Sequence, residues 1–307
     1  MEILKFLENI RNPILDTFFS LLTYLGDETA FIAVALIVFW CASKKYGYYI
    51  LGVGFAGTAV NQFLKLSFRV PRPWVKDPSF TIVESAREGA TGYSFPSGHT
   101  QTAIGLYGGV FAIAKNKALK ILMIVLCVLV PFSRTYLGVH TPLDVLVSVG
   151  VSLFFVIVMK PIVDITDEKP CLMQVYLILV MAFAVILTIF AEFSKFPADI
   201  DAENLASGVK KAYTLLGCTI GLVIANPIER RYINFTVSGK WYTQIIKVVL
   251  GLGILLLIKT FIKIPLDAIF GDLAVKHAVR YFIMVVFGVL VWPLTFPFVK
   301  KLEKKSN

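Results

Sequence analysis

Charged residues are scarce in this chain of 307 residues. Only 16% of them are Asp, Glu, Lys or Arg, whereas 57% are hydrophobic. A soluble domain has about 25% charged residues, because charge covers the surface that faces water. The shortage argues against a soluble domain and indicates an all-α fold, a polytopic helical membrane protein.

Cysteine and the common ligand-binding motifs are scarce as well. The four cysteines, at positions 41, 127, 171 and 218, lie within or beside apolar segments and form no C-x-x-C pair. Neither a zinc site nor a disulfide framework is therefore indicated. No H-E-x-x-H and no G-x-x-x-x-G-K-[ST] motif occurs, so the sequence gives no sign of these metal or nucleotide sites. The net charge of +10 is scattered between apolar runs, and we expect no nucleic-acid partner.

Long apolar runs take the place of the missing charge. A membrane-spanning helix needs about 20 apolar residues. Nine runs approach this length and predict spans at 29–43, 47–64, 99–115, 119–137, 142–163, 171–193, 208–226, 243–262 and 277–299. Residues 1–26 instead mix apolar and charged positions near a helical period, which predicts an interfacial amphipathic helix bent at Pro13. A short first span over 14–26 is the alternative.

Residues 160–170 divide the chain, because two prolines and several acidic residues interrupt the apolar runs there. We expect an interfacial or short first helix over 1–26, a catalytic membrane core over 27–165 and about four additional spans of unknown role over 166–307. Lysine and arginine gather in the loops on one side of the nine-span map. The positive-inside rule places these loops and the C-terminus in the cytoplasm, opposite the loop that contains Asp199 and Asp201.

Three clusters of basic residues and histidine stand at the ends of apolar runs, where charge is costly. One contains Arg134, His140 and Asp144. The spacing of four residues places His140 and Asp144 on one face of a helix, where the carboxylate can orient the imidazole for nucleophilic attack. Arg134 can grip phosphate oxygens with its planar guanidinium. The alternatives are a histidine that caps its own helix and an arginine at the lipid headgroups.

The second cluster is Pro96–Ser97–Gly98–His99, at the start of an apolar run. Ser97 can cap the helix and donate to a phosphate, and Gly98 lets a ligand approach the backbone. His99 then stands where an acid could protonate a leaving group. An ordinary capped helix start is the alternative.

The third cluster, Lys65 with Arg72 and Pro73, offers a point charge and a guanidinium fork to one oxyanion. Its alternative is the basic flank of a span. In chain order the clusters read K-x6-RP, PSGH and SR-x5-H-x3-D. Chance agreement with so long a pattern is very unlikely, so we expect the three segments to build one phosphate site.

The pattern resembles the type 2 phosphatidic acid phosphatase (PAP2) superfamily of membrane lipid phosphatases, over roughly residues 15–160. The resemblance implies a core of six spans and a site at the outer leaflet that needs no metal or other cofactor. It implies that His140 attacks phosphorus, Asp144 orients His140 and His99 protonates the leaving group. The phosphate ligands that it implies are Lys65, Arg72, Ser97, Gly98 and Arg134.

We therefore expect a phosphatase of the cell membrane that takes a lipid phosphate from the bilayer and forms a phosphohistidine. Phosphatidic acid, phosphatidylglycerol phosphate and a polyprenyl diphosphate are the candidate substrates. A phosphotransferase would use the same residues, and a transporter with a vestigial site is a third hypothesis. Lys276, His277 and Arg280 open the last span and could contact a second phosphate or form a basic flank. The sequence does not indicate an oligomeric state.

Overall fold

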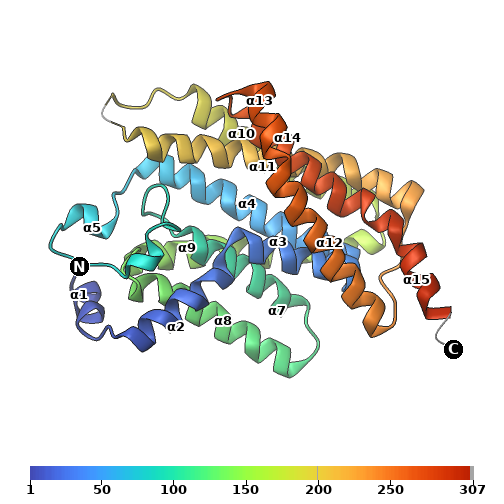
Figure 1. The fold of residues 1–307 in the computed structure, drawn as a ribbon, viewed down its shortest axis with the longest axis horizontal. Helices are drawn as coiled ribbons and strands as arrows, with labels where there is room; N and C mark the ends of the chain where they lie inside the picture. The colour runs from blue at the N-terminus through green and yellow to red at the C-terminus, as the bar shows by residue number, and fades with distance from the viewer. Residues whose placement is uncertain (199, 305–307) are drawn as a thin grey trace.

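The computed structural model describes residues 1–198 and 200–304, and within these ranges the chain contains helices, turns and loops but no β-strand. The expected all-α class is confirmed. The helices are α1 (Glu2–Asn9), α2 (Pro13–Thr23), α3 (Glu28–Ile37), α4 (Lys44–Phe68), α5 (Pro73–Lys76), α6 (Gly98–Ala103), α7 (Gly109–Ile113), α8 (Lys117–Tyr136), α9 (Pro142–Asp164), α10 (Cys171–Phe193), α11 (Ala202–Ile228), α12 (Trp241–Phe261), α13 (Lys263–Phe270), α14 (Val275–Val286) and α15 (Phe296–Lys304) (Figure 1). Four π-helical turns extend or join them, at Val38–Ala42, Ile104–Gly108, Glu229–Ile233 and Phe287–Val291.

Helix α4 forms the centre of the fold. Every residue from 47 to 57 is buried, and α3, α9, α10 and α11 pack around the helix. Glycine permits this crowding: a Cβ at Gly54 would lie 2.1 Å from the Phe31 ring, and one at Gly52 would lie 1.9 Å from the Tyr176 hydroxyl. Helices α3 and α10 therefore pack directly on α4.

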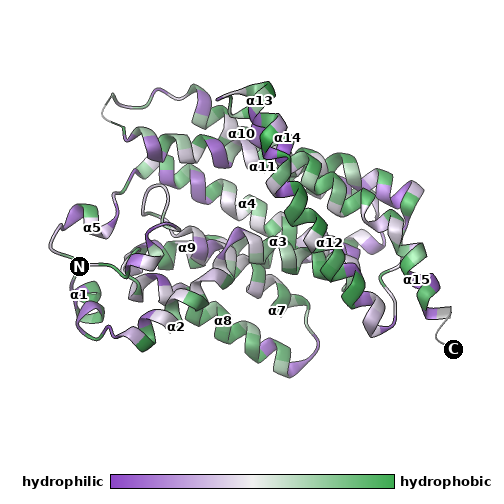
Figure 2. Cartoon of the chain, viewed as in Figure 1, coloured by the Kyte–Doolittle hydropathy of each residue, from purple (hydrophilic) through white to green (hydrophobic). Residues whose placement is uncertain are grey.

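Apolar side chains cover much of the outer surface. Helix α12 is green along most of its length in Figure 2, and Val249, Leu250 and Leu257 on it are exposed. Exposed apolar faces of this extent are unfavourable in water and suit a bilayer. In the part of the chain that the structure describes, six helices are long and apolar enough to cross a membrane: Lys117–Tyr136, Pro142–Asp167, Cys171–Phe193, Ala202–Ile233, Trp241–Phe270 and Val275–Glu303. The chain is a multi-pass membrane protein.

The expected count of nine spans is too high by this measure, although helices lie at all nine positions. The run at 29–43 is short and forms a pair with residues 13–26, bent by 54°, that counts at most as one further span. The run at 47–64 belongs to α4, whose last turns carry Asn61, Gln62 and Lys65. The run at 99–115 begins with polar residues and is broken into α6, a π-turn and α7. The three runs that do not count as spans are therefore 29–43, 47–64 and 99–115. They are short or broken, or they carry polar residues toward one end of the bundle.

The N-terminal segment bends where the sequence predicts. Helix α1 ends at Asn9, and α2 begins at Pro13 with Asn12 as its cap, its side chain accepting from the Leu15 amide at 3.0 Å. Leu4 and Leu7 are buried, whereas Phe6 and Ile14 are exposed.

The ends of several helices meet at one end of the bundle. A common cavity there is lined by the C-terminal half of α4, the N-terminal turns of α3 and α6, His140 just before α9, and the middle of α11. Helix α15 lies at the opposite side of the view in Figure 1, far from α5 and the N-terminus. Asp199, in the loop expected opposite the lysine-rich side, and Lys305, in the lysine-rich C-terminal tail, lie outside the described residues.

Candidate active site

His140 lies immediately before α9, and Asp144 lies in the first turn of that helix. Asp144 and Thr141 form a reciprocal cap: Asp144 Oδ2 accepts from the Thr141 amide at 2.8 Å, and Thr141 Oγ1 accepts from the Asp144 amide at 3.3 Å. The same Oδ2 accepts a 2.6 Å hydrogen bond from Ser94 Oγ and lies 3.6 Å from His140 Nδ1. One buried carboxylate thus completes the cap of α9 and also lies beside His140. The alternative of a histidine that caps its own helix does not fit, because Thr141 is the cap.

Arg72 stands against the other nitrogen of the same ring. Its Nη1 lies 2.9 Å from His140 Nε2. Because a guanidinium only donates, Nε2 accepts, and the ring proton is left on Nδ1 beside Asp144. Burial lowers the pKa of His140 well below its ordinary value, and the charges of Arg72, Lys65 and Arg134 lower this pKa further. A neutral ring with a lone pair on Nε2 is the form that a nucleophile requires.

Arg72 and Lys65 also hold the loop that precedes α6. Arg72 donates to the carbonyl oxygens of Thr91 and Gly92 at 2.8 and 3.0 Å, and Lys65 Nζ donates to the carbonyl of Tyr93. Burial lowers the pKa of Arg72 to about 10, so this side chain remains cationic at neutral pH. Both side chains are buried, which does not fit an exposed basic flank.

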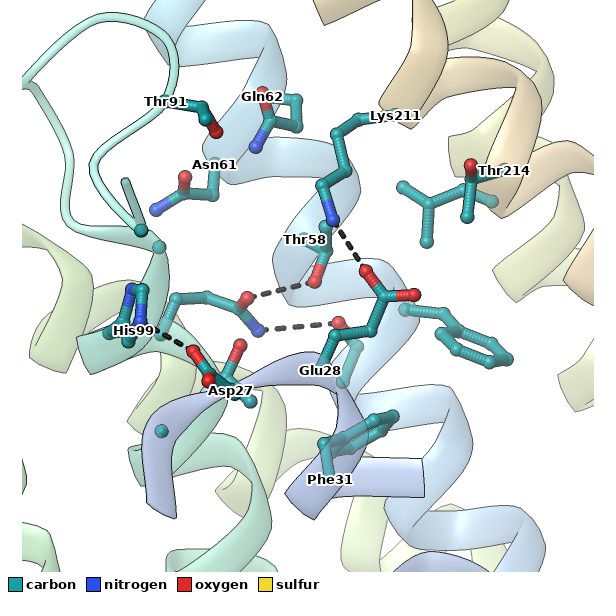
Figure 3. Close-up of a pocket in the computed structure, with 18 of the residues that line it drawn as sticks. Asp27, Glu28, Phe31, Thr58, Asn61, Gln62, Thr91, His99, Lys211 and Thr214 are labelled. Atoms are coloured by element: carbon teal, nitrogen blue, oxygen red, sulfur yellow. Dashed lines mark hydrogen bonds and ion pairs between the residues drawn. The ribbon is translucent and has the colours of Figure 1, made fainter. Parts of the chain in front are cut away.

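His99 is oriented by an acid that the sequence analysis missed. Its Nε2 lies 2.6 Å from Oδ1 of Asp27, the residue before α3 (Figure 3). Ser97 caps α6, and its Oγ accepts from the Thr100 amide at 3.4 Å and from Thr100 Oγ1 at 2.9 Å. Ser97 is fully buried. The expected helix cap is therefore present, but the Ser97 hydroxyl is engaged with Thr100 and is not directed at the space where a phosphate would lie.

Arg134 lies behind His140. Its Nη1 donates to Thr23 Oγ1 at 2.5 Å, and its carbonyl accepts from the His140 amide at 3.3 Å. Its Nε and Nη2 are buried and have no hydrogen-bond partner among the described residues. The guanidinium interacts electrostatically with both His99 and His140. Because it does not line the cavity, a direct grip on phosphate is not preformed.

A cavity of about 290 Å³ connects these groups. The expected site residues that line it are Lys65, Arg72, Gly98, His99 and His140. Those that stand behind its wall are Ser97, Arg134 and Asp144. Over residues 1–198 and 200–304, no three His, Cys, Asp or Glu side chains are grouped as metal ligands. The lining suits an anion, because three cations (Lys65, Arg72 and Lys211) and two imidazoles meet there with only two carboxylates, Asp27 and Glu28.

The C-terminal half supplies another wall of the cavity. Lys211 of α11 reaches Glu28 at the start of α3, with 2.5 Å between Nζ and Oε2 (Figure 3). Thr214 and Cys218 of the same helix also line the cavity. Beyond residue 166 the sequence indicated only Lys276, His277 and Arg280 as possible phosphate contacts. Glu28 and Lys211 were missed because they are 183 residues apart in the sequence, and only the fold brings the two together.

Comparison with known proteins settles the family. The model of the PAP2 superfamily matches residues 42–166, and the model of its phosphatase transmembrane extension matches residues 213–305. Phosphatidylglycerophosphatase B of Bacillus subtilis is 31% identical over 163 residues, which cover 48% of this chain and 76% of that protein. The chain belongs to the PAP2 superfamily. It is an enzyme of this lipid phosphatase family, as the resemblance of its motif pattern to the family implied.

Two further relatives of the PAP2 chain are phosphatases by name. Undecaprenyl-diphosphatase BcrC of Bacillus subtilis is 29% identical over 179 residues, which cover 53% of this chain and 88% of that protein. A probable sphingosine-1-phosphate phosphatase of Dictyostelium discoideum is 29% identical over 160 residues, which cover 48% of this chain and 38% of that protein. No solved structure matches the chain significantly.

Proposed function

We propose that this PAP2 protein hydrolyses the terminal phosphate of a membrane lipid through a phosphohistidine at Nε2 of His140, without a metal ion. The observation that carries the proposal is the position of this nitrogen, 2.9 Å from the Arg72 guanidinium, beside a cavity lined by Lys65 and His99. A phosphoryl group bound there would accept the hydrogen bonds of Arg72 and release Nε2 for attack. Fixed cations of this kind stabilise the charge on the equatorial oxygens in the transition state.

The two chemical steps balance with the groups present. In the first, His140 Nε2 forms a bond to phosphorus while the bond from phosphorus to the leaving oxygen breaks. His99, which enters this step as an imidazolium paired with Asp27, gives its Nδ1 proton to that oxygen. In the second, water attacks the phosphohistidine and transfers a proton to His99, which restores both rings. Asp144 and Asp27 act as positioning residues. Asp144 lies beside Nδ1 of His140 and leaves Nε2 for the reaction, whereas Asp27 lies beside Nε2 of His99 and leaves Nδ1.

We assign this chemistry to residues 27–165 and place the site at the extracytoplasmic face, with the C-terminus in the cytoplasm. The position of the cavity at the helix ends opposite the lysine-rich loops supports this orientation. A membrane-impermeant thiol reagent applied to intact cells should label an introduced cysteine at exposed Asp272 and spare native Cys171, which is exposed at the other end. The reverse pattern would contradict the orientation.

The decisive experiment compares His140→Ala with the wild-type protein in detergent. Phosphate release should be measured from phosphatidic acid, phosphatidylglycerol phosphate and a polyprenyl diphosphate, with and without a chelator. We expect at least about a thousandfold loss in the variant, the order seen when a catalytic nucleophile is removed. Lys263→Gln, an exposed change on α13 away from the cavity, is the control.

Covalent trapping tests the intermediate directly. Wild-type protein quenched during turnover of a ³²P-labelled lipid should carry acid-labile, base-stable label, and His140→Ala should carry none. Undiminished activity in His140→Ala, or loss of wild-type activity in chelator, would overturn the proposed mechanism.

A further inference from the structure

A second, larger cavity opens beside the catalytic one. Its volume is about 1130 Å³, and it lies between the N-terminal turns of α11 and α14 and the end of α12. The two cavities share Glu28, Thr91, Lys211 and Thr214 as lining residues. A group bound in one cavity therefore borders directly on a group bound in the other.

Basic side chains dominate the lining of the second cavity. They are Lys210, Lys211, Lys259, Lys276, His277 and Arg280. The acidic residues of the same lining are Glu28, Glu203 and Asp272. All the basic residues belong to the C-terminal helices, so the half of the chain without catalytic residues supplies the positive charge.

Two of these cations are paired with carboxylates, and two others are not. Lys211 pairs with Glu28, and Lys276 pairs with Asp267 at 3.0 Å. Lys210 and the ammonium group of Lys259 have no carboxylate within ion-pair distance among residues 1–198 and 200–304. Two flexible ammonium groups are thus left to meet an anion.

Arg280 is held in place for such an anion. Its Nε donates to the Lys259 carbonyl at 3.1 Å, and Nη2 donates to the same oxygen. This contact leaves Nη1 without a hydrogen bond to any described residue. His277 lies near Lys210, Lys276 and Arg280, close enough to interact electrostatically with each.

We propose that the second cavity binds another phosphate of the same lipid substrate, separated from the phosphate under attack by a short polar spacer. This inference rests on the proposed function of the catalytic cavity. The volume far exceeds that of one phosphate and accommodates a headgroup, and cations are the usual partners of phosphate oxygens. The C-terminal extension then selects lipids with two phosphates, such as phosphatidylglycerol phosphate, over lipids with one, such as phosphatidic acid.

The test compares these two lipids with identical acyl chains on one set of variants. Lys210→Gln with Lys259→Gln should lower kcat/KM for phosphatidylglycerol phosphate at least about tenfold, because two charge-assisted contacts are lost. The same double variant should change kcat/KM for phosphatidic acid less than about twofold, since only the catalytic cavity is used. Lys263→Gln is the matched control on α13, and Lys210→Arg with Lys259→Arg should restore the preference. A melting curve of each variant checks that the fold is retained.

The outcomes separate the two proposals. If the wild type releases phosphate from neither lipid, the proposed function fails. If it hydrolyses both and the double variant leaves their ratio unchanged, the second phosphate site is wrong while the catalytic proposal stands. Inorganic phosphate should also be titrated as an inhibitor of phosphatidic acid hydrolysis. A larger inhibition constant for phosphate in the double variant, with an unchanged ratio of kcat/KM for the two lipids, would show that the cavity holds free phosphate. This result would overturn the inference.

Discussion

The two halves of this PAP2 protein use polar residues in opposite ways. In the half up to α9, charged side chains of the motifs that meet at the cavity, such as Lys65, Arg72 and Asp144, are buried and bonded to backbone groups. In the half from α10 onward, the charges at the same end, such as Lys210 and Asp272, are largely exposed around an open cavity. The first arrangement fixes reacting groups in one geometry, as catalysis requires. The second leaves side chains free to adapt to a ligand.

The halves are nevertheless one fold. Helix α10 packs on α4 and α11, and α11 packs on α14. Through Lys211 and Thr214, α11 also reaches the catalytic cavity. The contrast therefore makes distinct predictions: changes in the first half should affect the chemical steps, and changes in the second should affect substrate choice or stability.

The largest expected effect after loss of His140 comes from His99. His99→Ala should lower kcat for a lipid phosphate by about 10²–10⁴-fold, because the leaving alkoxide then departs without a proton. A substrate with a nitrophenolate leaving group, which departs as a stable anion, should lose much less. Rates for both substrates should be measured on the same preparation. Equal losses would show that His99 does not serve as the acid.

Asp27 should have a smaller effect of the same kind, as a positioning residue. Asp27→Asn removes the charge 2.6 Å from His99 Nε2 but keeps the shape of the side chain. We expect kcat for the lipid to fall about ten- to a hundredfold, the range typical of residues that orient a functional histidine. In the His99→Ala background the change should have little further effect. An additive loss in the double variant would assign Asp27 a separate role.

The three clusters of basic residues and histidine could be recognised in the sequence because each is a short pattern with its own chemistry. Arg72, His99 and His140 were expected at one site, and the fold brings them to one cavity. Asp27 and Lys211 could not be predicted in this way. Each is part of a short charged pair, Asp27–Glu28 or Lys210–Lys211, that does not indicate its partner, and the partner is remote along the chain.

Direction of side chains was harder to predict than their proximity. Ser97 and Arg134 lie in the motif, yet the Ser97 hydroxyl serves the cap of α6 and Arg134 donates to Thr23 behind the wall. Sequence spacing cannot decide between a cap and a ligand, because both uses need the same residue at the same place. The expected number of spans was too high for a related reason. Helix α4 combines a long buried stretch with polar last turns, and an apolar run in the sequence does not show whether the end of its helix serves a site or the membrane.

The titration of His140 tests the electrostatics of the catalytic half. Burial and the neighbouring cations lower the pKa of His140 below its ordinary value of 6.5. The ring should therefore stay neutral from pH 8 down to below pH 6.5, and protonation at lower pH should remove the nucleophile. NMR of histidine-labelled protein can follow this, because the chain has three histidines and His140→Gln identifies the resonance. Arg134→Gln removes one nearby cation and should raise the pKa, whereas a wild-type midpoint at or above 6.5 would contradict the structure.

The smallest expected effect concerns the extension and its packing. A Cβ at Gly217 of α11 would lie 2.0 Å from the carbonyl oxygen of Ala278 in α14, whereas one at Gly253 of α12 meets nothing within 4 Å. Gly217→Ala should therefore lower the free energy of unfolding by about 1–3 kcal/mol, the usual range for overpacking. Gly253→Ala is the control and should leave Tm unchanged or slightly raised, since alanine favours a helix.

The same pair of variants decides whether the extension supports the catalytic half or only surrounds it. Helix α11 bears Lys211, which holds Glu28 at the catalytic cavity, and Ala278 directly follows His277 of the basic cavity. Separating α11 from α14 should thus weaken the preference for a two-phosphate lipid before it reduces turnover of a one-phosphate lipid. We would measure both activities below the Tm of Gly217→Ala. Equal loss of the two activities would mean that α11 acts on the catalytic residues themselves, and the functional contrast between the halves would no longer hold.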